Sequence, residues 1–405
     1  MALKYGFSFV ALVILTMTGA NQVAIAKEQN GDFVHRMGNQ LVVGHDDRVV
    51  YLRGVNLLYD RVSSSFCGRG DWKVADHTDW GVPVSCWYQE KHFRLLKEIG
   101  FNAVRINLSY RVFEDNKAPG QWKESGWKLI DQLVQWGREY GIYLILDMHV
   151  APGGAGIIAC KGCGYRTWDE PFYQRRLVSL WKAIARRYAN EPQIVAYDLL
   201  NEPAPTRNAG QWKVLAQQVI DSIRSVDRHH LLVVEMVQWV FDRNNRSLLQ
   251  DMDAKTLKEF QFLVRDSQTI YDAHYYVPKG YTVQDERGTN GGRYPDDSVR
   301  ETSTDNKPMR RNKQFLRHEV DVVSQFWASK AMPVNFGEWG TVISPGKGGI
   351  DYVQDLLQLM DERDIHWQFY SMDRLYQIEC CFDDNPTRAR NQNLIDVFSR
   401  HFDTH

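Results

Sequence analysis

Residues Ile194–Pro203 read Ile-Val-Ala-Tyr-Asp-Leu-Leu-Asn-Glu-Pro, a mostly apolar run that ends abruptly in polar residues and a proline. A short apolar run bounded by a turn signal is typical of a strand buried on both faces, as in a parallel sheet. Because Pro203 has no N–H to donate to a neighbouring strand, we expect the strand to stop there. Glu202 would then lie at the carboxyl end of a buried strand, where barrel enzymes carry catalytic groups. Alone, Asn-Glu-Pro also fits a surface glutamate beside a turn, so the rest of the chain has to decide.

On both sides of this stretch, predicted strands alternate with predicted helices. Gly100 and Gly141 are typical helix C-caps, and Pro171 suits the first turn of a helix. The expected strands are Val49–Leu57, Asn102–Leu108, Ile142–Met148, Ile194–Leu200, Leu231–Val237, Thr269–Tyr276, Pro333–Gly337 and His366–Met372. The expected helices are Trp87–Ile99, Gly126–Tyr140, Pro171–Tyr188, Gln211–Val226, Asn312–Ser329, Asp351–Asp361 and Arg390–Phe402.

Repeated β/α units predict a parallel sheet covered by helices, and eight units suit a closed (β/α)8 barrel, the TIM barrel. An open doubly wound sheet is the alternative, but no Gly-x-Gly-x-x-Gly follows the first strand, as a dinucleotide-binding fold would require. We therefore predict one α/β catalytic domain over residues 27–405, with an N-terminal β-hairpin that begins at Phe33. Residues Pro278–Pro308 are polar and charged, and we expect a long loop there.

The N-terminus and the cysteines indicate export. Lys4, an apolar stretch Gly6–Met17 and the small-x-small sequence Ala24-Ile25-Ala26 predict a signal peptide over residues 1–26. An uncleaved N-terminal anchor is the alternative, and no later apolar run is long enough to span a membrane. We expect a secreted or periplasmic protein whose even number of cysteines forms disulfides, although the pairing stays open. A zinc site is a weaker interpretation, because adjacent cysteines make poor tetrahedral ligands. The six cysteines are Cys67, Cys86, Cys160, Cys163, Cys380 and Cys381.

The chain has a formal net charge of -1 at pH 7, which excludes electrostatic capture of nucleic acid as an expected function. Polar residues instead gather at the ends of the predicted strands. Since the carboxyl ends of barrel strands share one mouth, these side chains should converge there, and burying so many charges without a function would be costly. They are Arg105, Asp147, His149, Asn201, Glu202, Glu235, His274, Tyr276, Glu338, Tyr370 and Asp373. We interpret Glu235 as structural.

Glu202 and Glu338 follow the fourth and seventh predicted strands and form the informative pair. A retaining glycosidase needs two carboxyl groups about 5–5.5 Å apart, one to attack the anomeric carbon and one to protonate the leaving oxygen. We expect Arg105 to keep one carboxylate ionised, while a negative neighbour and partial burial keep the other protonated. Asp147-x-His149 also suggests a metal hydrolase, but the set of ligands is incomplete, so no metal or other cofactor is expected.

Six short blocks that occur in this order resemble those of glycoside hydrolase family 5, the cellulase family of clan A, over essentially all of the mature chain. They are Arg53-Gly54-Val55-Asn56, Asn102-Ala103-Val104-Arg105, Asp147-Met148-His149, Asn201-Glu202-Pro203, His274-Tyr275-Tyr276 and Phe336-Gly337-Glu338-Trp339. Asn-Glu-Pro alone is a weak motif, whereas six blocks at strand ends are a specific one.

The resemblance implies a role for each matching residue. Glu202 would be the acid/base and Glu338 the nucleophile, oriented by Arg105 and Tyr276. Asn201 would bind the sugar 2-hydroxyl in subsite -1, which His149 and His274 would complete. The family usually has a tryptophan platform after strand eight, whereas Tyr370 is the match here, with Trp367 as the alternative. Trp168, Trp239 and Trp339 fit either sugar platforms or packing.

The resemblance thus implies a retaining β-glycoside hydrolase that acts on an oligo- or polysaccharide, and an endo-β-1,4-glucanase is the leading hypothesis. Together with the predicted signal peptide, we expect a secreted enzyme, and we expect it to be a monomer. A β-mannan, a β-1,3- or β-1,6-glucan or a glucosylated lipid are alternative substrates. A catalytically dead carbohydrate-binding barrel is the alternative from another class, and the intact pair Glu202 and Glu338 argues against it.

Overall fold

The computed structural model describes residues 33–57, 89–155, 165–237, 259–282, 291–341, 343–372 and 391–404. All six cysteines, Trp239, Asp373 and the predicted signal peptide lie outside these ranges. None of the helices within them has the length and apolarity needed to cross a membrane.

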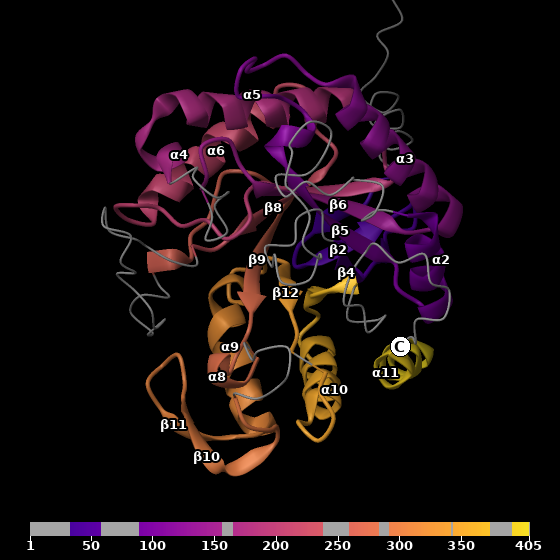
Figure 1. Ribbon diagram of the computed structural model, residues 1–405, viewed down its shortest axis with the longest axis vertical. Coiled ribbons are helices and arrows are strands. Elements are labelled where there is room, and N and C mark those ends of the chain that lie inside the picture. The colour runs from indigo at the N-terminus through magenta and orange to yellow at the C-terminus, as the bar shows by residue number, and fades with distance from the viewer. Residues whose placement is uncertain are drawn as a thin grey trace, which may run out of the picture.

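Eight parallel strands close into a barrel, as predicted, with the helices packed around it (Figure 1). The ring begins at β4, runs in chain order to β9 and is closed by β12 and β13, which pairs back to β4. The strands are β4 Arg53–Leu57, β5 Ala103–Ser109, β6 Tyr143–Val150, β7 Ile194–Asp198, β8 Leu231–Glu235, β9 Thr269–Tyr275, β12 Val334–Trp339 and β13 His366–Phe369. The carboxyl ends of all eight strands therefore meet at one mouth.

The outer helices follow the strands that they cover. Gly100 and Gly141 adopt left-handed conformations directly after α2 and α3, which confirms their predicted role as C-caps. The longer helices are α2 Glu90–Ile99, α3 Glu124–Tyr140, α5 Pro171–Tyr188, α6 Gly210–Arg224, α9 Lys313–Ala328, α10 Gly349–Asp361 and α11 Gln392–Asp403. The single-turn helices are α4 Arg166–Asp169, α8 Lys279–Thr282 and the 3-10 turn η2 Tyr110–Val112.

The barrel interior is apolar at the amino end and charged at the carboxyl end. Ala103, Ile145 and Val233 lie in one buried cluster with Leu41 and Val43 of the N-terminal sheet. This sheet therefore caps the amino end of the barrel, and it has three strands, β1 His35–Met37, β2 Gln40–Val43 and β3 Arg48–Val49, where we predicted a hairpin. The next inward positions of the barrel strands are Arg105, Asp147 and Glu235, all fully buried. Alternation along the strands thus sorts apolar from charged layers.

The prediction of a loop over Pro278–Pro308 is wrong where the structure describes that segment. Besides α8, it contains β10 Asp296–Thr302, which pairs with β11 Pro308–Arg311 in a hairpin beside α9 (Figure 1). The hairpin turn is anchored on α9, because Thr304 donates its N–H and O–H to the buried Glu319. These anchors are polar and the strands lack an apolar face, so no hydrophobic periodicity marked them in the sequence.

Candidate active site

Arg105 is the centre of the polar layer inside the barrel. It projects inward from β5, it is fully buried, and all five of its N–H donors are used. Nε donates to Asp198 at 2.9 Å, and Nη1 donates to Asn56 and Glu338 at 2.9 and 3.0 Å. Nη2 donates to Asn201 at 3.1 Å and Glu235 at 2.9 Å. One guanidinium therefore connects five side chains, which come from β4, β8, β12, and β7 with the turn that follows it.

More acids than bases surround this guanidinium. Asp147 Oδ1 also lies 3.1 Å from Nη2 of Arg105. Burial raises the pKa of Asp147 to about 7 and that of Asp198 to about 6, although the charge of Arg105 opposes both shifts. Because a buried charge must be paired, such a group of carboxylates holds protons that exposed acids would lose. Asp147 and Asp198 can thus bind protons at a higher pH than exposed aspartates do.

Glu338 lies at the mouth, near the end of β12. Its Oε1 accepts from Arg105 at 3.0 Å and its Oε2 accepts from the phenol of Tyr276 at 2.9 Å. The preceding Gly337 is required by packing, because a Cβ there would lie 2.3 Å from Oδ2 of Asp272. The Gly337 N–H also donates to Oδ1 of Asp272 at 3.1 Å. The carboxylate of Glu338 is therefore held on both oxygens, by Arg105 of β5 and by Tyr276 directly after β9.

Glu202 follows β7 in a left-handed backbone conformation, with φ of 41°, which is uncommon for a residue other than glycine. Its N–H donates to Oε2 of Glu235 at 2.7 Å, and its Oε1 lies 2.9 Å from Nδ1 of His274. The predicted strand extended to Leu200, but β7 ends at Asp198, so the chain turns earlier than the apolar run indicated. The turn directs the Glu202 side chain toward β9, the strand of His274.

His274 lies between three carboxylates. Nδ1 is 2.9 Å from Glu202 and 3.5 Å from Glu338, and Nε2 is 3.3 Å from Glu235. Burial alone would lower the pKa of His274, but the charges of Glu235 and Glu338 raise it well above its ordinary value. Burial raises the pKa of Glu202 too, yet the hydrogen bond and charge of His274 outweigh it and leave that pKa lowered. The lowered pKa of Glu202 runs against the expectation that this carboxyl stays protonated, and the raised pKa of His274 favours the proton on the ring.

His149 is held by Asp147 of the same strand, with Nδ1 2.7 Å from Oδ2. Burial lowers the pKa of His149 to about 4, so the ring is neutral at pH 7. A neutral ring that donates from Nδ1 keeps Nε2 as an acceptor. His149 can thus accept a hydrogen bond from a ligand hydroxyl.

Asn201 precedes Glu202 and is 1% exposed. Its Oδ1 is occupied by Arg105, whereas its Nδ2 has no hydrogen-bond partner within the described part of the chain. A buried amide N–H without a partner is costly unless a ligand satisfies it. This donor is adjacent to Glu202 in the chain and is available to a ligand.

The two predicted catalytic carboxylates are close together. One oxygen of Glu202, one of Glu338 and a ring nitrogen of His274 all lie within 4.8 Å of one another. Asp147, Asp198 and Glu235 form a second group with the same spacing, and the guanidinium of Arg105 contacts all three of them. A cationic side chain therefore already pairs with all three carboxyl groups of that second group.

Aromatic residues separate into mouth and core. Tyr370 is half-buried and its ring packs edge-on against Tyr276, with centroids 6.2 Å apart. Trp367 is fully buried and packs against Phe398 and Phe402 of α11, on the outer side of the barrel. Trp168 and Trp339 are also buried in the core. Of these four side chains, only Tyr370 is placed to contact a ligand at the mouth.

Sequence reasoning missed two residues of this site, Asp198 and Asp272. It assigned Glu235 a structural role but did not predict which residues Glu235 contacts. Each is the last inward-facing residue of its strand or close to it, within an otherwise apolar or aromatic run. A charged residue at an inward position next to a strand end was the available signal.

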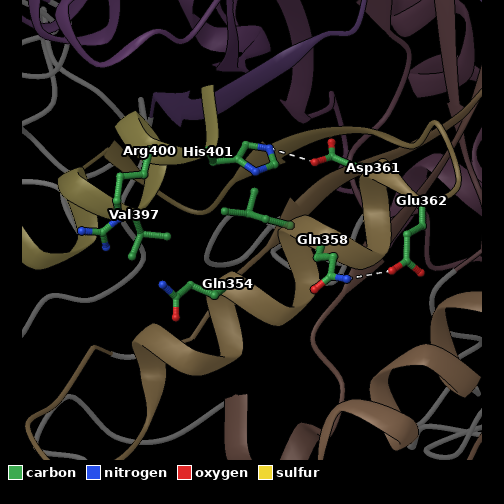
Figure 2. A pocket seen from close by; sticks show the side chains of 8 residues that line it. Gln354, Gln358, Asp361, Glu362, Val397, Arg400 and His401 are labelled. Atoms are coloured by element: carbon green, nitrogen blue, oxygen red, sulfur yellow. Dashed lines mark hydrogen bonds and ion pairs between the residues drawn. The ribbon is translucent and has the colours of Figure 1, made fainter. Parts of the chain in front are cut away.

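A surface groove lies away from this mouth, between α10 and α11 (Figure 2). It is lined by Gln358, Val397 and Arg400, among others, and His401 pairs with Asp361 at 3.2 Å. Asp361 also pairs with Arg53, the first residue of β4, so the groove borders the amino end of the barrel.

Comparisons with known proteins agree with this geometry. The model of the family described as cellulase, glycosyl hydrolase family 5, matches residues 67–374. Endoglucanase C of Acetivibrio thermocellus is 27% identical over 339 residues, which cover 77% of this chain and 90% of the relative. A cellodextrinase A of Ruminococcus flavefaciens is 26% identical over 196 residues, 48% of this chain and 53% of that protein. The crystal structure of endoglucanase Cel5A from Thermotoga maritima superposes with a TM-score of 0.61 at 18% identity, covering 92% of this chain and 99% of that one.

A closed (β/α)8 barrel with two facing glutamates at its mouth defines a class of hydrolases, and the family match is specific within it. The chain belongs to glycosyl hydrolase family 5, the cellulase family, and is a glycoside hydrolase with a carbohydrate substrate.

Proposed function

We propose that this protein is a retaining β-glycoside hydrolase, with Glu338 as nucleophile and Glu202 as acid/base. The observation that carries the proposal is the spacing of Glu202 and Glu338, whose oxygens lie within 4.8 Å of one another. This is the short separation used by double displacement, whereas inversion leaves room for a water between the carboxyl groups. Arg105 and Tyr276 donate hydrogen bonds to the two oxygens of Glu338 and orient it for attack, and His274 supplies Glu202 with a proton.

The remaining mouth residues bind the sugar in the same proposal. Asn201 donates its free N–H to the 2-hydroxyl, His149 accepts from a hydroxyl through Nε2, and Tyr370 stacks on the sugar ring. The substrate is a β-1,4-glucan that is cleaved internally, because endoglucanases recur among the relatives. A β-1,3-glucan is the second candidate, since a glucan 1,3-beta-glucosidase of Candida oleophila is 33% identical over 151 residues, 35% of either chain.

A pair of variants tests the assignment. With 2,4-dinitrophenyl β-cellobioside, whose leaving group needs no proton, Glu202→Gln should release a rapid burst of phenol and then turn over slowly. Glu338→Gln should show neither burst nor turnover. On cellooligosaccharides both variants should lose on the order of 10³-fold or more in rate. The β-anomer should appear first in NMR spectra of the wild-type product, and a first α-anomer would refute retention.

The proposal includes export, monomeric state and independence from metals. Mass spectrometry of protein secreted by the native host should find an N-terminus near Lys27 and oxidised cysteines, and six free thiols would contradict the disulfides. Light scattering should give the mass of one chain. Activity should survive EDTA, because two carboxylates suffice for the chemistry; loss that a defined divalent ion reverses would favour a metal mechanism.

A further inference from the structure

Glu235 contacts both the backbone of Glu202 and the ring of His274. It lies at the end of β8, is fully buried, and uses both carboxylate oxygens. Oε2 accepts the backbone N–H of Glu202 at 2.7 Å. Oε1 accepts from Arg105 at 2.9 Å and lies 3.3 Å from Nε2 of His274. Glu235 therefore connects the backbone of Glu202 to the ring of His274, which in turn contacts the side chain of Glu202.

The contact with His274 determines where protons lie. Oε1 of Glu235 lies 3.3 Å from Nε2 of His274 in an ion-pair contact, which is attractive when the ring is protonated. Nδ1 of the same ring is then the nitrogen that faces Glu202, at 2.9 Å. The order carboxylate, imidazole and reacting group is that of a hydrolase triad, in which the buried acid fixes the orientation of the ring.

The contact with Glu202 fixes the other partner. A left-handed glutamate with φ of 41° is a strained conformation that its surroundings must hold. The hydrogen bond from its N–H to Glu235 is the contact that anchors this backbone inside the barrel. Without this hydrogen bond, the carboxyl of Glu202 would no longer be held within hydrogen-bond distance of Nδ1 of His274.

We propose that Glu235 is a positioning residue for acid/base catalysis. It holds the ring of His274 and the backbone of Glu202 so that Nδ1 of His274 exchanges the catalytic proton with Oε1 of Glu202. In the first step the proton passes from His274 Nδ1 to Glu202 and on to the departing oxygen. In the second step Glu202 takes a proton from the attacking water and returns it to His274. This inference rests on the proposed role of Glu202.

The charged groups that face His274 come from several strands. The contacting ones are Glu202, Glu235 and Glu338, and the more distant ones are Arg105, Asp147, His149, Asp198 and Asp272. Asp198 offers a matched control, because it is equally buried and accepts from Arg105 at 2.9 Å but has no hydrogen bond with Glu202 or His274.

The test compares Glu235→Gln with Asp198→Asn on two aryl glycosides, after thermal melts show that both variants are folded. On phenyl β-cellobioside, which needs a proton to leave, kcat/KM of Glu235→Gln should fall on the order of 10²-fold. On 2,4-dinitrophenyl β-cellobioside, kcat/KM of Glu235→Gln should fall by no more than that of Asp198→Asn. The alkaline limb of the pH profile with phenyl β-cellobioside should also move to lower pH in Glu235→Gln, because the contact with Glu235 that raises the pKa of His274 is lost.

A double-mutant cycle identifies the residue through which Glu235 acts. In a Glu202→Gln background, adding Glu235→Gln should cost phenyl β-cellobioside hydrolysis little more than adding Asp198→Asn does. Equal losses on both aryl glycosides, or the full loss in the Glu202→Gln background, would overturn the proposal. If Glu202→Gln itself loses the same factor on both aryl glycosides, the assignment of Glu202 as acid/base fails, and the role of Glu235 is withdrawn with it.

Discussion

His274 Nδ1 lies 2.9 Å from Oε1 of Glu202, and this contact sets the charge of both groups. It leaves the pKa of Glu202 below its ordinary value, although burial raises it, while His274 keeps a proton at neutral pH. A general acid normally owes its proton to a raised pKa. In the proposed mechanism the neighbouring ring holds the proton, and Glu202 receives it when the bond breaks.

Replacing Arg105 with lysine should reduce both activity and stability. Lysine keeps the charge but has three donors and no planar fork, so several of the five contacts are lost inside the barrel. We expect kcat/KM to fall on the order of 10²-fold or more and unfolding free energy to fall by about 3 kcal/mol. The control is Arg53→Lys at the amino end, where Arg53 pairs with Asp361 at 2.9 Å. Equal effects on activity from both variants would contradict a special role for Arg105.

Two adjacent tyrosines separate catalysis from packing. Tyr276 donates to Glu338 at 2.9 Å, whereas Tyr275 points outward and donates to the Leu316 carbonyl at 3.2 Å. Tyr276→Phe should lower kcat/KM roughly 10- to 100-fold with little effect on stability, since a hydrogen bond to a charged group contributes about 1.5–3 kcal/mol. Tyr275→Phe should cost about 1 kcal/mol of stability and leave kcat/KM unchanged. Steady-state kinetics and urea melts check both, and the reverse pattern would refute the orientation of Glu338.

Tyr370 and Trp367 are distinguished in the same way. If Tyr370 stacks on the sugar, Tyr370→Ala should raise KM roughly tenfold, a loss of about 1.4 kcal/mol of binding. Trp367→Phe should instead cost on the order of 1–2 kcal/mol of stability, because that ring is packed in the core against α11. A rise in KM with Trp367→Phe and none with Tyr370→Ala would show that Tyr370 is not the platform.

Acid should destabilise the protein through buried histidines such as His366. Burial lowers the pKa of His366 to about 4, and its Nδ1 accepts the Leu52 N–H at 3.2 Å, which requires a neutral ring. Since the unfolded pKa is near 6.5, the unfolded chain binds more protons between pH 6.5 and 4. The contribution of neutral His366 to the free energy of unfolding is complete above pH 6.5. It is lost as the pH falls to 4, and the total loss is about 3 kcal/mol.

His366→Asn should therefore flatten the loss of stability between pH 7.5 and 4.5, as measured by urea melts. The exposed His45, replaced by asparagine, is the control and should leave that loss as it is in the wild type. An unchanged slope in His366→Asn would show that acid acts through other groups.

Strand ends and glycine caps made the barrel predictable, because apolar runs and turn residues are local signals. The eight strands appeared near their expected positions, and the residues Arg105, Glu202, His274 and Glu338 converge as their strand positions implied. The proton on His274 was not predictable, since it depends on three carboxylates from three different strands. The hairpin β10–β11 was missed for a related reason, because the residue that anchors it, Glu319, is distant in the sequence.

The central claim, that Glu338 attacks the sugar while Glu202 carries the proton, is tested most directly by trapping the intermediate. In a 2-deoxy-2-fluoro β-cellobioside with a dinitrophenyl leaving group, fluorine slows both steps but the good leaving group keeps the first one fast. Peptide mass spectrometry of the inactivated wild-type protein should find the fluorosugar on the peptide that contains Glu338 and on Glu338 itself. A sugar on Glu202 or Glu235, or no adduct from an enzyme that cleaves the parent cellobioside, would contradict the account.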